Sequence, residues 1–265
     1  MWFDTEFGTC KLVIDLNDVK NKDYLQQTIV KLSDSLIQKH GLIQKKTWII
    51  KFDKQSIQEL PEWSHGITKK TPDTIIMLTP YNSNISKNRF EQVLKHELMH
   101  LYLNRKNTNS FFIPRWFKEG VAMHEADEFS INRKIILSKG YWSNELFTLK
   151  DLKSFRGLNR KQIKLAYSQS IAAFVAMQYL FNVNINNQLL REISRVNTFE
   201  DFFYNTTKTT ADEFELLYLD FIANHYKWFF LLQATNFFII LFPILLVVGY
   251  IIKSKHAKKK YLKWE

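Results

Sequence analysis

Residues 93–104 read "VLKHELMHLYLN", a helical pattern in which apolar residues surround two histidines and a glutamate. His96 and His100 are four residues apart, and Glu97 directly follows the first histidine. Because an α-helix turns by about 100° per residue, the two imidazoles lie on one face, one turn apart. The surrounding apolar residues predict a helix that is buried on nearly all sides. Polar groups on such a helix need partners, since unpaired buried polar groups are costly.

This spacing indicates a metal site. Two imidazoles one turn apart can reach one ion at about 2.0–2.1 Å, and Glu97 lies close enough to act on a water beside that ion. The pattern H-E-x-x-H is typical of zinc metalloproteases. Because so short a pattern also arises by chance, the hypothesis requires a third ligand. Catalytic zinc takes three protein ligands and keeps one position for water.

The stretch "IPRWFKEGVAMHEAD" (residues 113–127) offers that ligand. Its apolar spacing predicts a helix from Arg115 to Asp127, with Pro114 at its start. Glu119 lies in the middle of this helix beside Gly120, a small residue that lets another helix approach closely. Metal ligation is the best explanation for a glutamate at this position.

Other polar residues of this helix receive different interpretations. His124 is five residues past Glu119 and about 140° around the helix from it, so a supporting or surface position is favoured over ligation. It remains the first alternative if Glu119 is not a ligand. Glu125, Asp127 and Glu128 are interpreted as a solvated helix end.

The combined pattern resembles a known clan. H-E-x-x-H, then 18 residues, then W-[FL]-x-E-G-x-A is similar to the gluzincins, whose third zinc ligand is a glutamate. "PEWSHGIT" before the motif and "AYSQSIAAFVAMQYL" after it resemble the bacterial peptidase MA-like family, over about residues 10–225. The resemblance implies one Zn²⁺ held by His96, His100 and Glu119, with Glu97 as the general base.

A further catalytic group is expected on the helix predicted from "KLAYSQSIAAFVAMQYLF" (residues 164–181). Resemblance to the zinc aminopeptidases implies that Tyr167 stabilises the oxyanion of the tetrahedral intermediate. The simpler interpretation is a core aromatic residue whose hydroxyl lies at the rim. The aminopeptidases also carry a G-x-M-E-N segment that holds the free amine of the substrate. None precedes His96, so an endopeptidase is favoured.

Composition limits the remaining possibilities. The 265-residue chain has a formal net charge of +11, of which +5 lies in the last 13 residues. Because no basic cluster is interleaved with aromatic residues, no nucleic-acid partner is expected. The single cysteine, Cys10, excludes an intramolecular disulfide and a thiolate zinc site.

Residues 228–252 read "WFFLLQATNFFIILFPILLVVGYII" and contain no charged residue. A run of this length predicts a transmembrane helix, and so contact with a lipid bilayer. The lysine-rich tail after it predicts a cytoplasmic C-terminus and an extracytoplasmic catalytic domain. Residues 1–25 show no signal peptide, which leaves two alternatives open: a start upstream, or a cytoplasmic domain.

Hydrophobic patterning completes the expected fold. Strands are predicted at 10–16, 47–52 and 74–79, a helix at 22–40 closed by Gly41, and mostly helix from 89 to 226. The expected fold class is α+β: a zincin-like domain at 1–226 with a small N-terminal mixed sheet, a transmembrane helix at 228–252 and a basic tail at 253–265. Residues 64–68 or 74–79 are expected to bind the substrate backbone as an added strand.

These features predict a membrane-anchored, zinc-dependent metallopeptidase that acts on a peptide or protein substrate, as an endopeptidase. The competing hypothesis is an inactive relative that binds peptides or partner proteins. Intact ligands together with Glu97 favour the enzyme, because a binding module has no need of all four groups.

Overall fold

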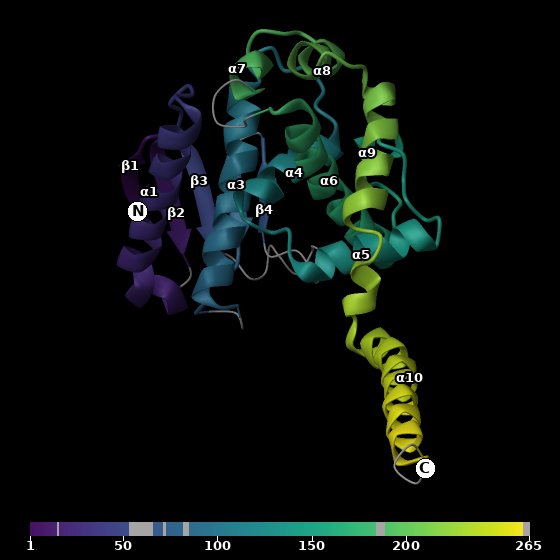
Figure 1. Cartoon of the computed structure of the whole chain (residues 1–265). Helices are drawn as coiled ribbons and strands as arrows, with labels where there is room; N and C mark the ends of the chain where they lie inside the picture. Colours follow the sequence, from purple (N-terminus) through teal and green to yellow (C-terminus); the bar gives the residue numbers. More distant parts are fainter. Residues whose placement is uncertain (15, 53–65, 71–72, 82–84, 184–188, 262–265) are drawn as a thin grey trace.

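The computed structural model shows an α+β chain with a sheet at its N-terminal end and helices over the rest (Figure 1). It describes all residues except 15, 53–65, 71–72, 82–84, 184–188 and 262–265. The α+β class and the N-terminal position of the sheet, predicted from the sequence, are confirmed.

The sheet is mixed, as predicted. Its strands are β1 (Trp2–Thr5), β2 (Gly8–Ile14), β3 (Trp48–Phe52), β4 (Gly66–Lys69) and β5 (Thr74–Met77). They are ordered β1-β2-β3-β5-β4, so β1 and β4 form the two edges. The inner strands β2, β3 and β5 are parallel, and each edge strand pairs antiparallel with its neighbour. All four residues of β5 are buried, which is typical of a strand covered on both faces.

The first helices connect and cover this sheet. A 3₁₀ turn, η1 (Leu16–Asn21), leads into α1 (Lys22–His40), which joins β2 to β3. Helix α1 ends before Gly41, as predicted, and Gly41 has a φ of +88° that favours glycine.

The remainder of the chain is mostly helical, also as predicted. Its elements are α3 (Lys87–Lys106), α4 (Arg115–Glu125), α5 (Ile131–Trp142), η2 (Asp151–Lys153), α6 (Arg160–Phe181), α7 (Leu190–Ile193), α8 (Phe199–Thr207) and α9 (Ala211–His225). Helix α6 begins four residues earlier than the sequence predicts, because Asn159 and Gln162 form a capping box.

Helix α3, which carries the H-E-x-x-H pattern, lies between the sheet and the helical part (Figure 1). It contacts β4 and β5 on one side and α4 on another, and it also packs against α1. Phe90, Leu94 and Leu98 are fully buried in the main core. The prediction of a largely buried helix is confirmed, and this position brings the motif to the edge of the sheet.

Close packing joins α4 to α6. A Cβ built on Gly120 would lie 2.5 Å from the backbone oxygen of Ser170 and 2.8 Å from Cβ of Phe174. Any larger residue at this position would push the helices apart. The small residue beside Glu119 therefore serves the close helix approach that the sequence predicts.

The apolar run at 228–252 is divided between two elements. Its first residues form a 3₁₀ turn, η4 (Phe229–Leu232), which packs against α5. Gln233 then takes an extended conformation, with φ −71° and ψ 127°. A new helix, α10 (Ala234–Tyr261), begins after it and continues past the end of the run into the lysine-rich segment. It extends away from the rest of the chain (Figure 1).

The predicted transmembrane helix is therefore wrong. The indole nitrogen of Trp142 donates to the backbone oxygen of Lys227 at 2.6 Å, and its ring contacts those of Trp228 and Phe230. Through these contacts, the first residues of the apolar run at 228–252 pack against α5. Within the described part of the chain, no helix combines the length and the apolar character needed to cross a membrane. The single-pass localisation and the topology inferred from that helix are withdrawn with it.

Candidate metal centre

Three side chains from two helices converge on one point. The Nε2 atoms of His96 and His100 are 3.1 Å apart. Oε2 of Glu119 lies 3.4 Å from each of these nitrogens. Helix α3 supplies both histidines and α4 supplies the glutamate. The structure thus brings together the three ligands predicted from the sequence, and this group could hold a metal ion.

The size of this triangle fits zinc. Ligand atoms at about 2.0–2.1 Å from a tetrahedral ion lie about 3.3–3.4 Å apart, which matches the 3.1–3.4 Å separations here. Oε2 of Glu119 is buried and has no hydrogen-bond partner within the described residues. A buried carboxylate oxygen without a partner is costly, and a cation at the centre of the triangle would satisfy it. Two imidazoles and a carboxylate also form a donor set that zinc accepts.

Arg115 fixes the other oxygen of Glu119. Its Nε donates to Oε1 at 3.1 Å, from one helical turn earlier on α4. Oε1 is thereby occupied, and Oε2 is turned toward the histidines. Burial raises the pKa of Glu119, but the effect of His100 and His96 is larger and opposite. The pKa of Glu119 is therefore well below its usual value. The carboxylate is therefore ionised and ready to ligate.

The prediction that Glu125, Asp127 and Glu128 form a solvated helix end is wrong for two of these three residues. Asp127 is exposed, as predicted, but Glu125 and Glu128 are buried. Glu125 pairs with His40 at 2.9 Å, Lys39 at 2.8 Å and Lys95 at 3.1 Å. Burial raises the pKa of Glu125, while these partners lower it to about 2. Glu125 thus ties α4 to α1 and α3.

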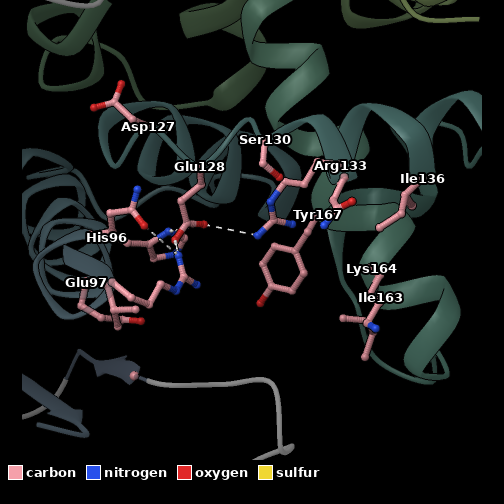
Figure 2. Close-up of a pocket in the computed structure, with 15 residues that line it drawn as sticks. His96, Glu97, Asp127, Glu128, Ser130, Arg133, Ile136, Ile163, Lys164 and Tyr167 are labelled. Carbon is pink, nitrogen blue, oxygen red and sulfur yellow. Dashed lines mark hydrogen bonds and ion pairs between the residues drawn. The ribbon is translucent and has the colours of Figure 1, made fainter. Parts of the chain in front are cut away.

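Glu128 supports the first histidine. Its Oε2 lies 3.7 Å from Nδ1 of His96, and it stands between His96 and Arg133 in the cavity (Figure 2). Arg89 and Arg133 hold the Glu128 carboxylate at 2.8 Å and 3.4 Å. A carboxylate beside the distal nitrogen of a metal-bound histidine orients the ring and raises its basicity. Sequence reasoning missed this role, because Arg89 and Arg133 lie 39 and 5 residues away in the chain.

Glu97 is held by the edge strand of the sheet. Thr68 on β4 donates its hydroxyl to Oε2 of Glu97 at 2.6 Å and to the backbone oxygen of Glu97 at 3.0 Å. A Cβ on Gly66 would lie 3.0 Å from Cγ of Glu97, so glycine allows this close approach.

The structure also distinguishes between the two segments that were predicted to bind the substrate backbone. β4 is an edge, whereas β5 (Thr74–Met77) is enclosed between β3 and β4. Residues 64 and 65 lie outside the described residues.

Tyr167 faces the same region from α6, on the opposite side of the cavity from His96 and Glu97 (Figure 2). Nη2 of Arg115 donates to its hydroxyl oxygen at 3.3 Å. Burial raises the pKa of Tyr167, and the charge of Glu119 raises it further. The hydroxyl therefore stays protonated at neutral pH and can donate a hydrogen bond to a substrate oxyanion.

His124, the alternative ligand, lies outside this group. Its ring packs on Phe174, with 5.3 Å between the centroids, and burial lowers its pKa. Among the described residues, the metal-binding group contains Glu119 and not His124.

The i, i+4 spacing of Arg115 and Glu119 was a signal in the sequence that could have indicated the positioning role of Arg115.

The site opens into two adjoining cavities. One, of about 450 Å³, is lined by Glu128 and will be called the Glu128 cavity. The other, of about 730 Å³, is lined by Lys118 and will be called the Lys118 cavity. Both are lined by Gly66, His96, Glu97, Ile163 and Tyr167. His96 and Glu97 thus lie where the two cavities meet, whereas His100 and Glu119 line only the Lys118 cavity.

Comparison with known proteins assigns no family. No protein-family model matches the chain, and no curated protein matches it. The resemblance to the peptidase MA-like family accordingly stays a prediction, and the arguments below are based on the geometry of the site.

Tyr167→Phe gives a first test of the site. For the hydrolase that the sequence predicts, we expect kcat to fall by about 10²-fold to 10³-fold, the usual effect of removing one oxyanion donor, with a much smaller change in KM. Zinc content should stay at one per chain, because Tyr167 is not among the ligands. Steady-state kinetics and metal analysis of the purified variant check both points. An unchanged kcat would assign Tyr167 to packing alone.

Proposed function

We propose that this protein is a zinc-dependent endopeptidase, with His96, His100 and Glu119 as zinc ligands. The observation that carries the proposal is the triangle of candidate ligand atoms, which lie 3.1–3.4 Å from one another. The buried carboxylate of Glu97 lies on α3, the helix that supplies both histidines. Two imidazoles, a buried carboxylate oxygen without a hydrogen bond to any described residue and an adjacent general base form the set that metal-assisted peptide hydrolysis requires.

The residues of the chain divide the chemistry between them. Zinc, when bound, supplies a Lewis acid that polarises a carbonyl and acidifies water. Glu97, oriented by Thr68, accepts the proton of the attacking water and later delivers it to the leaving amine. Tyr167 donates its hydroxyl to the oxyanion that forms on the former carbonyl. Arg115 contacts both Glu119 and Tyr167, so it sets the position of a ligand and of the oxyanion donor together.

The shape of the cleft favours cleavage within a chain over removal of a terminal residue. Cavities extend to both sides of His96 and Glu97, so substrate residues can lie on both sides of the reacting bond. β4, the last strand of the sheet among the described residues, contacts the same glutamate through Thr68, so a peptide that lies in the cleft would run alongside this strand.

Incubation of the zinc-loaded protein with a denatured protein substrate, followed by mass spectrometry of the products, tests this proposal. We expect internal fragments that disappear when a chelator is added and return when zinc is restored. Products that lack only N-terminal residues would contradict the endopeptidase assignment. Absence of any cleavage by protein with one bound zinc per chain would contradict the enzyme itself and favour a peptide-binding role.

Zinc binding should depend on pH through His96. Burial lowers the pKa of His96, but Glu119, Glu128 and Glu97 raise it more, to about 9 in the metal-free chain. His96 is therefore protonated at neutral pH, and zinc must displace that proton. We expect zinc affinity to rise by about tenfold per pH unit between pH 7 and 8.5 and to level off above pH 9. Competition titrations with a chelator of known affinity measure this slope, and a flat profile would contradict it.

A further inference from the structure

We propose that the Lys118 cavity selects peptide segments with acidic side chains, which places an acidic preference on one side of the cleaved bond. The inference rests on the proposed endopeptidase function and names its substrate class. It comes from the distribution of charge along the cleft, which differs between its two halves.

The Lys118 cavity is lined by four cationic side chains: Arg115, Lys118, Lys153 and Arg156. Among its described lining residues, the carboxylates are Glu97 and Glu119, and both belong to the metal site. Arg115 is already engaged with Glu119. In the described part of the chain, Lys118, Lys153 and Arg156 take part in no ion pair. This half of the cleft therefore presents three cations without an ion pair, of which Lys153 also lines a neighbouring cavity that contains Glu200, Asp201, Asp212 and Glu215.

The Glu128 cavity provides the contrast. With Glu97 again assigned to the metal site, its cationic lining residues are Arg89, Arg133 and Lys164, and its carboxylates are Asp127 and Glu128. Both arginines are also paired directly with Glu128. Among the described residues of this cavity, an acidic side chain would find only Lys164 without a paired carboxylate. The excess of positive charge is thus concentrated in the Lys118 cavity and is not spread evenly along the cleft.

The placement of Lys118 is unfavourable without an anion. It lies three residues after Arg115 on α4, on the same side of the helix, and like charges at this spacing repel. A carboxylate in the cavity would relieve this repulsion.

The other two cations are carried by an anchored segment. Lys153 and Arg156 flank Phe155, and both Leu152 and Phe155 are buried. The guanidinium of Arg115 lies over the Phe155 ring, 4.7 Å from its centroid. The same ring packs edge-on against Tyr167, at 5.3 Å between centroids. The segment that carries the cations is thereby fixed to the residues that surround the reacting bond.

Matched quenched-fluorescence peptides test the proposal. Two peptides carry three glutamates on the N-terminal or the C-terminal side of a common cleavable core, and each has a glutamine counterpart. We expect kcat/KM for one glutamate peptide to exceed that for its glutamine counterpart by about tenfold, and the advantage to shrink at high salt. The Lys153→Gln/Arg156→Gln variant should lose most of this ratio through KM. Lys31→Gln/Lys139→Gln removes the same charge from exposed sites outside the described cavities and should keep it.

A measurement of peptide binding distinguishes failure of the acidic preference from failure of the proposed endopeptidase function. Zinc-loaded Glu97→Gln protein should bind the preferred glutamate peptide more tightly than its glutamine counterpart in fluorescence anisotropy, whether or not turnover is seen. Equal binding and equal kcat/KM for all four peptides would overturn the acidic preference while leaving the endopeptidase intact. The proposal would also be overturned if Lys153→Gln/Arg156→Gln and Lys31→Gln/Lys139→Gln lowered the glutamate-to-glutamine ratio of kcat/KM equally. The net charge of the protein alone would then explain the preference.

Discussion

Glu119→Ala should abolish stoichiometric zinc binding at micromolar metal. The substitution removes one of three protein ligands, so the affinity should fall by more than about 100-fold, beyond the 10–100-fold typical of groups that only support a ligand. It also leaves Arg115 without its partner on α4. Circular dichroism should therefore accompany the metal analysis, to show that the variant keeps its helical content.

Glu128→Gln provides the matched comparison for Glu119→Ala. Glu128 touches His96 from outside the triangle, at 3.7 Å from Nδ1. Its replacement should weaken zinc by about 10-fold to 100-fold and leave one zinc per chain at saturation. If Glu119→Ala instead keeps the wild-type affinity, the third ligand lies elsewhere, and His124 would be the first residue to replace.

Glu97→Gln should retain zinc and lose hydrolysis. The amide keeps the size of the side chain but cannot accept the proton of the attacking water, so kcat should fall by about 10³-fold or more. Hydrolysis of a denatured protein and zinc content, measured on the same preparation, give both values. Glu91→Gln changes a carboxylate on the same helix that pairs with Tyr24 away from the site, and it should leave both values unchanged.

The outcome for Glu97→Gln also decides between an enzyme and a binding module. If wild type and variant are equally inactive yet bind peptides equally well, the protein is a peptide-binding relative of an enzyme. Rapid hydrolysis by the variant would mean that another group accepts the proton.

The convergence of His96, His100 and Glu119 could be predicted from the sequence because its signals are local. His96 and His100 are one helical turn apart, and Glu119 lies on a second helix whose apolar stripe is clear. The central strands were predicted for the same reason, since their apolar runs are bounded by polar residues. Strand β1 (Trp2–Thr5) was missed, because two apolar residues followed by two polar ones neither alternate nor form a marked apolar run.

Features that depend on distant residues could not be predicted. Glu128 follows the end of α4 and resembled a solvated residue, yet Arg89 from α3 encloses it. Thr68 gains its role only when β4 becomes the edge strand beside Glu97. The run at 228–252 was judged on hydropathy alone, which does not register that Trp142 binds its first turn.

Stepwise zinc titration of chelator-treated protein, with hydrolysis of an unstructured peptide as the readout, tests the central claim most directly. The account predicts no activity without metal, a linear rise with added zinc and a plateau at one equivalent per chain. Activity that persists without zinc, or that stays absent with one zinc bound, would contradict it.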